Sequence, residues 1–153
     1  MNLYSQLLRP LLFQLPPEVA HHLTLAALRI PWMAPALSWN RVAPADPVEL
    51  MGLKFRNRLG IAAGVDKNAE APLAWKHLGF GFAELGTITL HPQPGNPRPR
   101  VFRYPKQQAL INRLGFPNLG AEALARRLFK ARQRHDFSNF PLGLNIEIGR
   151  AHV

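Results

Sequence analysis

Hydrophobic and polar positions repeat at helical spacing over the first 40 residues. The first apolar series comprises Leu3, Tyr4, Leu7, Leu8, Leu11 and Leu12, and the second comprises Ala20, Leu23, Ala27 and Ile30. Pro16 and Pro17 separate the two series and restart the chain. The pattern predicts two short amphipathic helices joined by a proline turn. A third segment, residues 32–39, brings Trp32, Met33 and Trp39 together.

The middle of the chain alternates between strand and helix patterns. Residues 41–47 form a proline-rich connector, and the alternation around Gly52 predicts a small hairpin. An apolar run at residues 60–65 predicts a buried strand, residues 68–78 a helix that Gly79 ends, and residues 80–89 a second strand. Strand, helix and strand within about 30 residues form a βαβ unit, which implies a parallel sheet.

The next segment, residues 91–103, contains four prolines and three arginines and predicts a long irregular excursion. Asn118 is then placed to cap a helix whose apolar face is Ala121, Leu124, Ala125 and Leu128. The opposite face, with Arg126, Arg127, Lys130 and Arg134, is typical of a solvated surface, and a binding patch is the alternative. Residues 141–146 predict a third strand that ends in an amide.

The stretch at residues 60–68 indicates a ligand site at the end of the first strand. Ala62, Ala63 and Gly64 have almost no side chain, so a flat or phosphate-bearing ligand can approach the backbone closely. Lys67 then supplies a mobile cation at the rim. Tight packing without a ligand is the alternative interpretation of these small residues.

Composition narrows the range of partners. The 153 residues suffice for one domain, and 47% of them are hydrophobic, which predicts a folded chain. Nineteen Lys and Arg against nine Asp and Glu give a net charge of +10, which favours anionic partners: phosphates, carboxylates, acidic lipids or nucleic acid. The absence of cysteine excludes disulfides, thiolate metal sites and a cysteine nucleophile.

The N-terminal 40 residues allow two interpretations that are compatible. Only Arg9, Glu18 and Arg29 are charged among residues 3–39, so the two helices need an apolar partner. They can pack on the main domain, or they can form a monotopic membrane patch with tryptophans at head-group level. No run of 18 apolar residues predicts a spanning helix, and Arg9 and Pro10 interrupt any signal-peptide pattern.

Familiar sets of catalytic side chains are missing from the sequence. It has no Ser-His-Asp set, no paired carboxylates and no histidines at metal-binding spacing. In a parallel α/β barrel, groups at the carboxyl ends of strands converge on one face, where ligands bind. We therefore expect Gly64 to Lys67, Thr87, Asn112 and Asn145 to converge there.

Three motifs together resemble class 2, quinone-dependent dihydroorotate dehydrogenases. They are residues 62–67 (AAGVDK), residues 86–100 (GTITLHPQPGNPRPR) and residues 111–116 (INRLGF), in the family's order and spacing. The N-terminal residues 13–21 (FQLPPEVAH) are similar to the segment that separates class 2 from the soluble class 1 enzymes. The resemblance extends from about Leu12 to Ile146.

The resemblance implies a fold and an activity. The fold is α/β: the N-terminal part of a (β/α)8 TIM barrel, preceded by a small helical membrane-associating domain. Residues 1–40 would form the helical quinone-tunnel segment, and residues 41–146 the first part of the FMN-binding barrel, with about three strands. The activity is oxidation of dihydroorotate to orotate in pyrimidine biosynthesis, with FMN as cofactor and a membrane quinone as acceptor. Peripheral attachment to the cytoplasmic side of the cell inner membrane follows from the same resemblance, and the absence of a mitochondrial-type presequence suggests a bacterial protein.

The resemblance also assigns residues to each ligand. FMN would contact Ala63, Gly64, Val65, Asp66, Lys67, Thr87 and Asn145. Dihydroorotate would contact Lys67, Asn112, Arg113, Leu114, Gly115 and Phe116. The quinone entrance would contain His21 and Arg103. No metal site and no nucleic-acid partner are expected.

The sequence departs from the family pattern at two places. Pro117 stands where the family usually has the first of two asparagines, so the resemblance assigns no amide contact to this position. After Ile146 the family continues with Gly-Lys-Asn-Lys, whereas residues 147–153 (EIGRAHV) match the translation of a sequencing adapter, which predicts a non-native tail. The family's catalytic serine base would then lie beyond the chain end. The 153-residue polypeptide alone is expected to fold poorly and to be inactive, because three strands do not close a barrel.

Two other functions fit parts of the sequence. A non-catalytic basic module could bind an anionic membrane or nucleic acid, but the arginines are dispersed and lack interleaved aromatics. A soluble class 1 flavoprotein is disfavoured by the N-terminal helices, and a requirement for quinone distinguishes the two.

Overall fold

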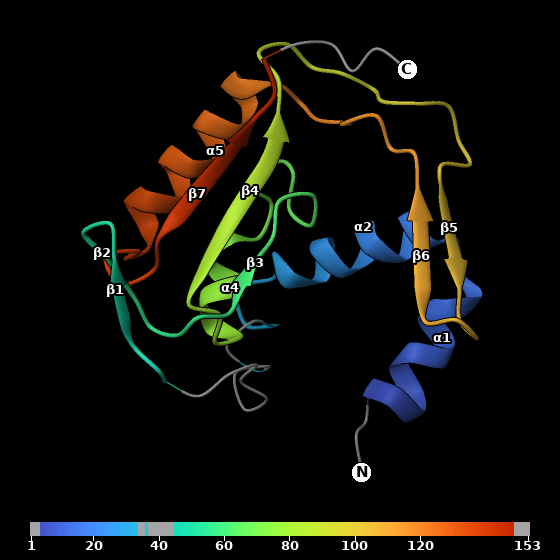
Figure 1. The fold of residues 1–153 in the computed structure, drawn as a ribbon, viewed down its shortest axis with the longest axis horizontal. Helices are drawn as coiled ribbons and strands as arrows, with labels where there is room; N and C mark the ends of the chain where they lie inside the picture. Colours follow the sequence, from blue (N-terminus) through green and yellow to red (C-terminus); the bar gives the residue numbers. More distant parts are fainter. Residues whose placement is uncertain (1–3, 34–35, 37–44, 149–153) are drawn as a thin grey trace.

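A three-stranded parallel sheet forms the centre of the mixed α/β fold (Figure 1). The structure is a computed structural model that describes residues 4–33, 36 and 45–148. The strand order is β3 (Gly60–Ile61), β4 (Phe82–Ile88) and β7 (Leu142–Ile146), with β4 in the middle. Gly60 pairs with Phe82 and Ala83 pairs with Leu142, both in parallel register. The predicted βαβ unit and the third strand are confirmed.

The side chains of β4 alternate between the two faces of the sheet, and one of these faces is buried against helices. Ala83, Leu85 and Ile88 are almost fully buried. They pack in one hydrophobic cluster with Trp75 of α4 (Pro72–His77) and Leu124 of α5 (Ala121–Arg134). The two helices therefore cover the same face of the sheet, and the opposite face is left for polar side chains.

Helix α4 begins at Pro72, so the prediction that it starts at Asn68 is wrong. The carboxylate of Asp66 accepts hydrogen bonds from the backbone N–H groups of Glu70 (2.6 Å) and Ala71 (2.9 Å). It also accepts one from the indole N–H of Trp75 at 3.1 Å. These bonds hold residues 66–71 in a loop. A helix that began at Asn68 would break these hydrogen bonds and leave the buried carboxylate of Asp66 without partners.

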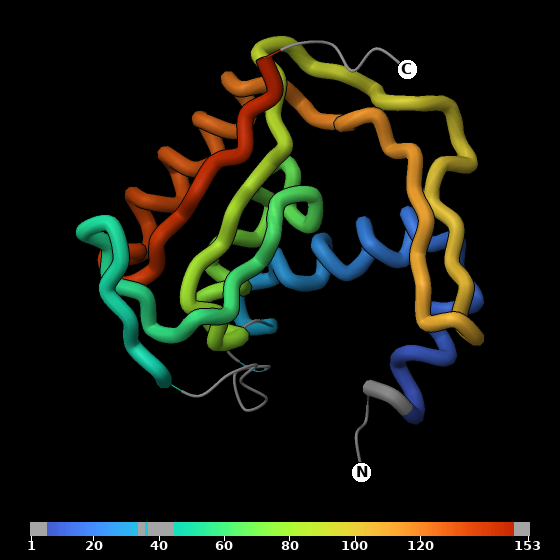
Figure 2. Tube along the Cα trace, viewed as in Figure 1, coloured from blue at the N-terminus to red at the C-terminus, as the bar shows by residue number. Residues whose placement is uncertain are grey.

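An antiparallel hairpin lies away from the sheet, on the right of Figures 1 and 2. It consists of β5 (Val101–Tyr104) and β6 (Ala109–Asn112), with Val101 opposite Asn112. The prediction that residues 91–103 are wholly irregular is therefore wrong for its last three residues. Local sequence gave no sign of this strand, because the pairing with residues 109–112 creates it. A second hairpin, β1 (Val48–Leu50) and β2 (Leu53–Phe55), confirms the turn predicted at Gly52.

The N-terminal helices bridge the sheet and the β5–β6 hairpin. A π-helical turn, η1 (Tyr4–Leu8), runs into α1 (Arg9–Gln14), and α2 (Pro17–Leu28) follows the proline turn. Figure 2 shows α2 running from the sheet to the hairpin. Leu25 and Leu28 join the main core, whereas Leu11 and Leu23 are more than half exposed. Most of the predicted third segment, residues 32–39, and residues 149–153 of the predicted tail lie outside the described part of the chain.

Helix α5 is not capped by Asn118, contrary to the prediction. Gly120 holds the N-cap position with a φ of 83°, and no side chain caps the helix there. Buried Asn118 instead accepts a hydrogen bond from the Gly120 N–H at 2.8 Å and donates one to the Thr89 hydroxyl at 2.9 Å. Asn118 therefore ties the start of α5 to the end of β4.

Replacing Asp66 with Asn tests the loop that delays α4. The single oxygen of an amide cannot accept all three hydrogen bonds that the two carboxylate oxygens of Asp66 accept. We therefore expect Asp66→Asn to lower the free energy of unfolding by about 2 kcal/mol. Urea unfolding followed by tryptophan fluorescence measures this change. The matched control is Asp46→Asn, whose carboxylate is 61% exposed and pairs with Arg58 at the surface. Its effect should stay below about 0.5 kcal/mol, and equal effects of the two substitutions would contradict the assignment.

Candidate functional site

A cavity of about 980 Å³ opens at the carboxyl ends of β3 and β4. Its wall comes from three parts of the chain: the strand ends, the β5–β6 hairpin with the loop after it, and α2. Most of the predicted site residues line it: Ala63, Gly64, Val65, Lys67, Thr87, His21, Arg103, Asn112, Arg113, Leu114, Gly115 and Phe116. The tertiary fold thus brings together residues that are up to 95 positions apart.

The strand ends meet through close backbone contacts. The N–H of Gly64 donates to the carbonyl of Gly86 at 2.6 Å. Gly86 allows no side chain, because a Cβ would lie 2.5 Å from the carbonyl oxygen of Asn145. Gly64 has a φ of +99°, and the space where its Cβ would be is empty. The backbone of residues 62–65 can therefore lie directly against a ligand, as the small side chains predicted.

Lys67 lies at the edge of this backbone surface. Its ammonium donates to the carbonyl of Gly64 at 2.7 Å. Burial lowers the pKa of Lys67, and Arg100 lowers it further, while Glu18 and Asp66 oppose the shift. Partial burial also means that little water competes for the ammonium, which strengthens its attraction to an anionic ligand.

Two of the predicted cofactor residues do not line the cavity in this structure. Asp66 is fully buried, and its carboxylate is committed to the loop before α4. Asn145 accepts a hydrogen bond from the Thr87 hydroxyl at 2.7 Å and donates one to Glu84 at 3.0 Å. Asn145 therefore fixes the side chain of Thr87, which does line the cavity.

The predicted substrate loop, residues 112–116, is held by the proline-rich segment before β5. The N–H of Asn96 donates to the carbonyl of Leu114 at 3.0 Å, and the amide of Asn96 donates to the carbonyl of Arg113 at 2.9 Å. The N–H of Arg113 donates to the carbonyl of Arg100 at 2.9 Å. The loop is thus held mainly through its own backbone, and the side chains of Asn112 and Arg113 are exposed. The guanidinium of Arg113 also donates to the carbonyl of Pro99 at 3.2 Å.

His21 and Arg103 form the other end of the cavity, where α2 meets β5. Arg103 donates to the carbonyls of Phe13 and Leu15, both at 3.4 Å, and its guanidinium lies 4.2 Å from the centre of the Phe13 ring. Burial lowers the pKa of His21, and the positive charges of Lys67 and His22 lower it further. His21 is therefore biased toward the neutral form near neutral pH.

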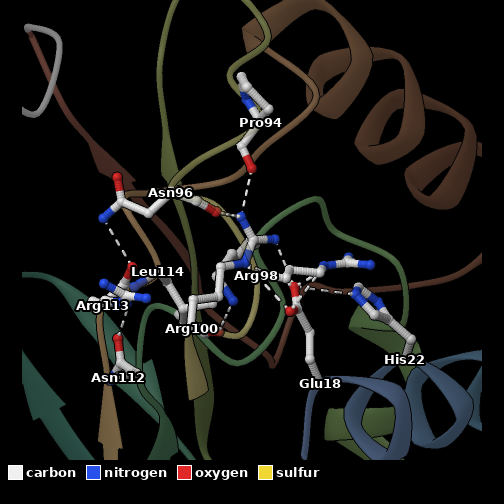
Figure 3. A network of polar contacts seen from close by, with 11 residues as sticks. Glu18, His22, Pro94, Asn96, Arg98, Arg100, Asn112, Arg113 and Leu114 are labelled. Carbon is white, nitrogen blue, oxygen red and sulfur yellow. Dashed lines mark hydrogen bonds and ion pairs between the residues drawn. The ribbon is translucent and has the colours of Figure 1, made fainter. Parts of the chain in front are cut away.

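Sequence reasoning missed the ion-pair cluster that joins these two ends. Glu18 of α2 faces Arg98 and Arg100, as Figure 3 shows. Arg100 is only 6% exposed, and its guanidinium donates to Glu18 at 2.6 Å and to the carbonyl of Pro94 at 2.6 Å. Glu18 is the one carboxylate in the apolar residues 3–39, and a single acid in such a segment was the available signal.

The cavity carries an excess of positive charge. Its lining includes Lys67, Arg100, Arg103 and Arg113, against the two carboxylates Glu18 and Glu70. A site of this kind favours anionic ligands. Among the residues that the structure describes, no group of three or more His, Asp or Glu side chains could hold a metal ion.

A second hollow, of about 1060 Å³, lies between α5, β7 and residues 88–96. Its wall is largely apolar and includes Leu124, Leu128, Leu144 and Ile146. Of the predicted site residues it contains only Gly115. We therefore place the functional site in the smaller, cationic cavity.

The fold and the site define a class of protein: a mixed α/β protein with a cationic ligand cavity at the carboxyl ends of parallel strands. Comparison with known families is more specific. The profile of the dihydroorotate dehydrogenase family matches residues 47–152. The chain belongs to the dihydroorotate dehydrogenase family.

Curated relatives and solved structures agree with this assignment. The chain is 54% identical to a dihydroorotate dehydrogenase (quinone) of Gloeobacter violaceus, over 95% of the chain and 41% of the relative. It is 49% identical to that of Methylococcus capsulatus, over 94% of the chain and 41% of the relative. The chain thus spans about two fifths of the length of these relatives.

Among solved structures, the crystal structure of the dihydroorotate dehydrogenase of Eimeria tenella in complex with ferulenol matches with a TM-score of 0.76 and 40% identity. That match covers 90% of this chain and 37% of the Eimeria chain. A ligand-free Eimeria structure matches with a TM-score of 0.71 and 42% identity, over 90% of this chain and 39% of the other.

The Glu18–Arg100 pair predicts how stability depends on pH. The hydrogen bond from Arg100 holds the pKa of Glu18 below its ordinary value of 4.5, with Arg98 adding to the shift against a smaller effect of burial. Because folding favours the carboxylate, the pair stabilises the fold above pH 4.5 and loses this contribution as the pH falls through the folded pKa. We expect Glu18→Gln to lower the free energy of unfolding by about 2 kcal/mol at neutral pH.

Urea unfolding of wild type and variant across the acid range tests this expectation. The difference between the two proteins should shrink as the pH falls below 4.5, because the wild-type carboxylate then takes up a proton. Arg98→Gln is the control, since Arg98 is 67% exposed and should contribute little. A difference that stays constant with pH would show that the charge of Glu18 does not stabilise the fold.

Proposed function

We propose that this chain is the N-terminal part of a flavoprotein that oxidises dihydroorotate to orotate and passes the electrons to a quinone. One observation carries the proposal: residues assigned by resemblance to three different ligands line one cavity. Ala63 to Val65 and Thr87 are at the strand ends, residues 112–116 at one wall, and His21 and Arg103 at the α2 end. Family membership and the names of the relatives support the same activity.

The residues present fit an FMN cofactor. Gly64 offers open space where a side chain would be, and Ala63 adds only a methyl group, so a planar ring can lie against this backbone. Bound FMN would supply a two-electron acceptor beside the substrate. Thr87, held by Asn145, would give the ring a hydrogen-bonding neighbour in a fixed orientation.

Lys67 and the substrate loop would bind and orient dihydroorotate. The half-buried ammonium of Lys67 would pair with the carboxylate of the substrate, and its burial would strengthen that attraction. Asn112, with Arg113 beside it, would hydrogen-bond the polar edge of the planar ring. Arg100 and Asn96 keep this loop in place through the backbone contacts described above.

The N-terminal helices would bring the quinone to the site. Four leucines of η1, α1 and α2 are exposed: Leu7, Leu8, Leu11 and Leu23. Helix α1 adjoins the cavity through Phe13, whose ring lies 4.2 Å from the guanidinium of Arg103. The four leucines would lie in the head-group region of a membrane, on the cytoplasmic side of a bacterial inner membrane. In the part of the chain that the structure describes, no helix is long and apolar enough to cross a bilayer.

The sheet supports the first part of an eight-stranded barrel. Three parallel strands carry helices α4 and α5 on one face, as the strands of a (β/α)8 fold carry their outer helices. Strand β7 has a partner on one side only within the described residues, and Leu144 and Ile146 on it are exposed. A further strand and helix would cover these apolar side chains and fill the second hollow.

A joined protein tests the activity. We expect residues 1–146 followed by the remaining C-terminal part of the Gloeobacter violaceus relative to form orotate from dihydroorotate, with FMN bound and only when a quinone is added. The 153-residue chain alone should show no turnover. In the joined protein, Lys67→Ala should lower kcat/KM about 10- to 100-fold through loss of a charge-assisted hydrogen bond.

Orotate absorbance follows the reaction, and Lys130→Ala on the exposed face of α5 is the control with wild-type activity. Turnover with a soluble acceptor but none with a quinone would favour a class 1 enzyme. A folded, FMN-loaded joined protein without turnover would contradict the proposal.

Vesicle flotation tests the membrane surface. We expect Leu7→Ser with Leu11→Ser to reduce binding to anionic phospholipid vesicles at least tenfold, because both side chains are more than half exposed and would enter the lipid. Leu50→Ser is the matched control: it is 60% exposed on β1, away from α1 in Figure 1, and should bind as the wild type does. Equal losses from both changes would locate membrane binding elsewhere.

A further inference from the structure

We propose that Glu18 is a positioning residue that, through Arg100, sets the conformation of the substrate loop, residues 112–116, from the N-terminal helix α2. The inference rests on the proposed function for the identity of the ligand. Its structural basis is independent of that ligand. Glu18 is not among the residues assigned to any ligand by resemblance.

The first step is the contact between α2 and the proline-rich segment. Nε and Nη2 of Arg100 both donate to the Glu18 carboxylate, at 3.1 Å and 2.6 Å for the Oε1 atom. Arg98 adds an ion pair of 3.1 Å to Oε2. The side chain of Glu18 is 15% exposed and that of Arg100 is 6% exposed, so water screens this pair weakly.

The second step is the fixing of the segment itself. The Nη1 atom of Arg100 donates to the carbonyls of Pro94 (2.6 Å) and Asn96 (3.0 Å). The one guanidinium therefore connects the turn at residues 94–96 to Glu18 of α2. This turn is close-packed: a Cβ on Gly95 would lie 2.3 Å from the carbonyl oxygen of Leu114.

The third step passes from this segment to the substrate loop. Asn96 holds the loop through the carbonyls of Arg113 and Leu114, and Arg113 returns two bonds, from its N–H to the Arg100 carbonyl and from its guanidinium to the Pro99 carbonyl at 3.2 Å. Figure 3 shows this continuous path from Glu18 to Asn112. A series of charged and polar contacts thus connects the loop to α2, and Arg100 is the residue that contacts both Glu18 and the proline-rich segment.

The same path explains why a carboxylate is needed at position 18. Without it, the buried guanidinium of Arg100 keeps its carbonyl partners but loses its counter-charge, so the turn at residues 94–96 is free to shift. Other basic side chains near Glu18 are Arg98, His22 at 4.0 Å and Lys67. None of them can replace a negative charge.

Hydrogen exchange measured by mass spectrometry in the joined protein tests whether Glu18 holds the substrate loop. We expect Glu18→Gln to speed amide exchange at residues 112–116 at least tenfold, with less than a twofold change in α5 and in the β1–β2 hairpin. Arg98→Gln should change the loop less than twofold. In an Arg100→Gln background, Glu18→Gln should have no further effect on the loop, because Glu18 acts through Arg100. Faster exchange throughout the chain would overturn the proposal, since Glu18 would then only stabilise the fold.

Orotate binding and turnover in the joined protein test whether Glu18 affects substrate binding through the loop. We expect Glu18→Gln to raise the dissociation constant of orotate and the KM of dihydroorotate about tenfold, with kcat reduced less than twofold and the bound FMN content unchanged. Glu18→Asp should recover part of the affinity. Wild-type affinity in the Gln variant would overturn the inference. If the wild-type joined protein binds no orotate, the proposed function fails, and the exchange result alone then decides the role of Glu18.

Discussion

The close approach of three strand ends is the constraint on which the site depends. The Gly64 N–H reaches the Gly86 carbonyl at 2.6 Å, and the backbone of Asn145 leaves no room for a side chain on Gly86. This contact fixes where β3, β4 and β7 end relative to one another. Lys67 and Thr87 leave the sheet at the same edge as a result, although 19 residues and a helix separate them. A larger residue at position 86 would push β4 and β7 apart, because its Cβ would lie 2.5 Å from the carbonyl oxygen of Asn145. At position 64 a side chain would instead strain a backbone with a φ of +99° and fill the space left open to a ligand.

Charge organises the other walls. The cavity gathers four cationic side chains, and mutual repulsion together with burial lowers the pKa values of Lys67 and His21. Glu18 offsets part of this repulsion, and Arg100 in turn holds the pKa of Glu18 low. The arrangement leaves net positive charge available to an anionic ligand while keeping the N-terminal helix attached.

Local patterns predicted most elements, and their failures share one cause. The parallel strands, the hairpin at Gly52 and the two N-terminal helices follow from periodicity and from proline and glycine positions. The late start of α4 and the buried position of Asn118 do not. In both cases a side chain that could start or cap a helix is buried and bonds elsewhere: Asp66 to Trp75, and Asn118 to Thr89. Strand β5 was missed because only its pairing with β6 across a turn makes it a strand.

The sequence by itself determined the family, the small residues of the ligand floor and the cation beside them, because these depend on residue type at fixed spacing. It also determined an apolar N-terminal segment with a single carboxylate. Only the tertiary structure decided that His21, Lys67, Arg103 and residues 112–116 share one cavity. It also decided that Asp66 and Asn145 do not line this cavity but bond the loop before α4 and the side chain of Thr87. The Glu18–Arg100 pair joins residues 82 positions apart. Such a pairing is set by how α2 crosses the sheet and the hairpin, which no local pattern encodes.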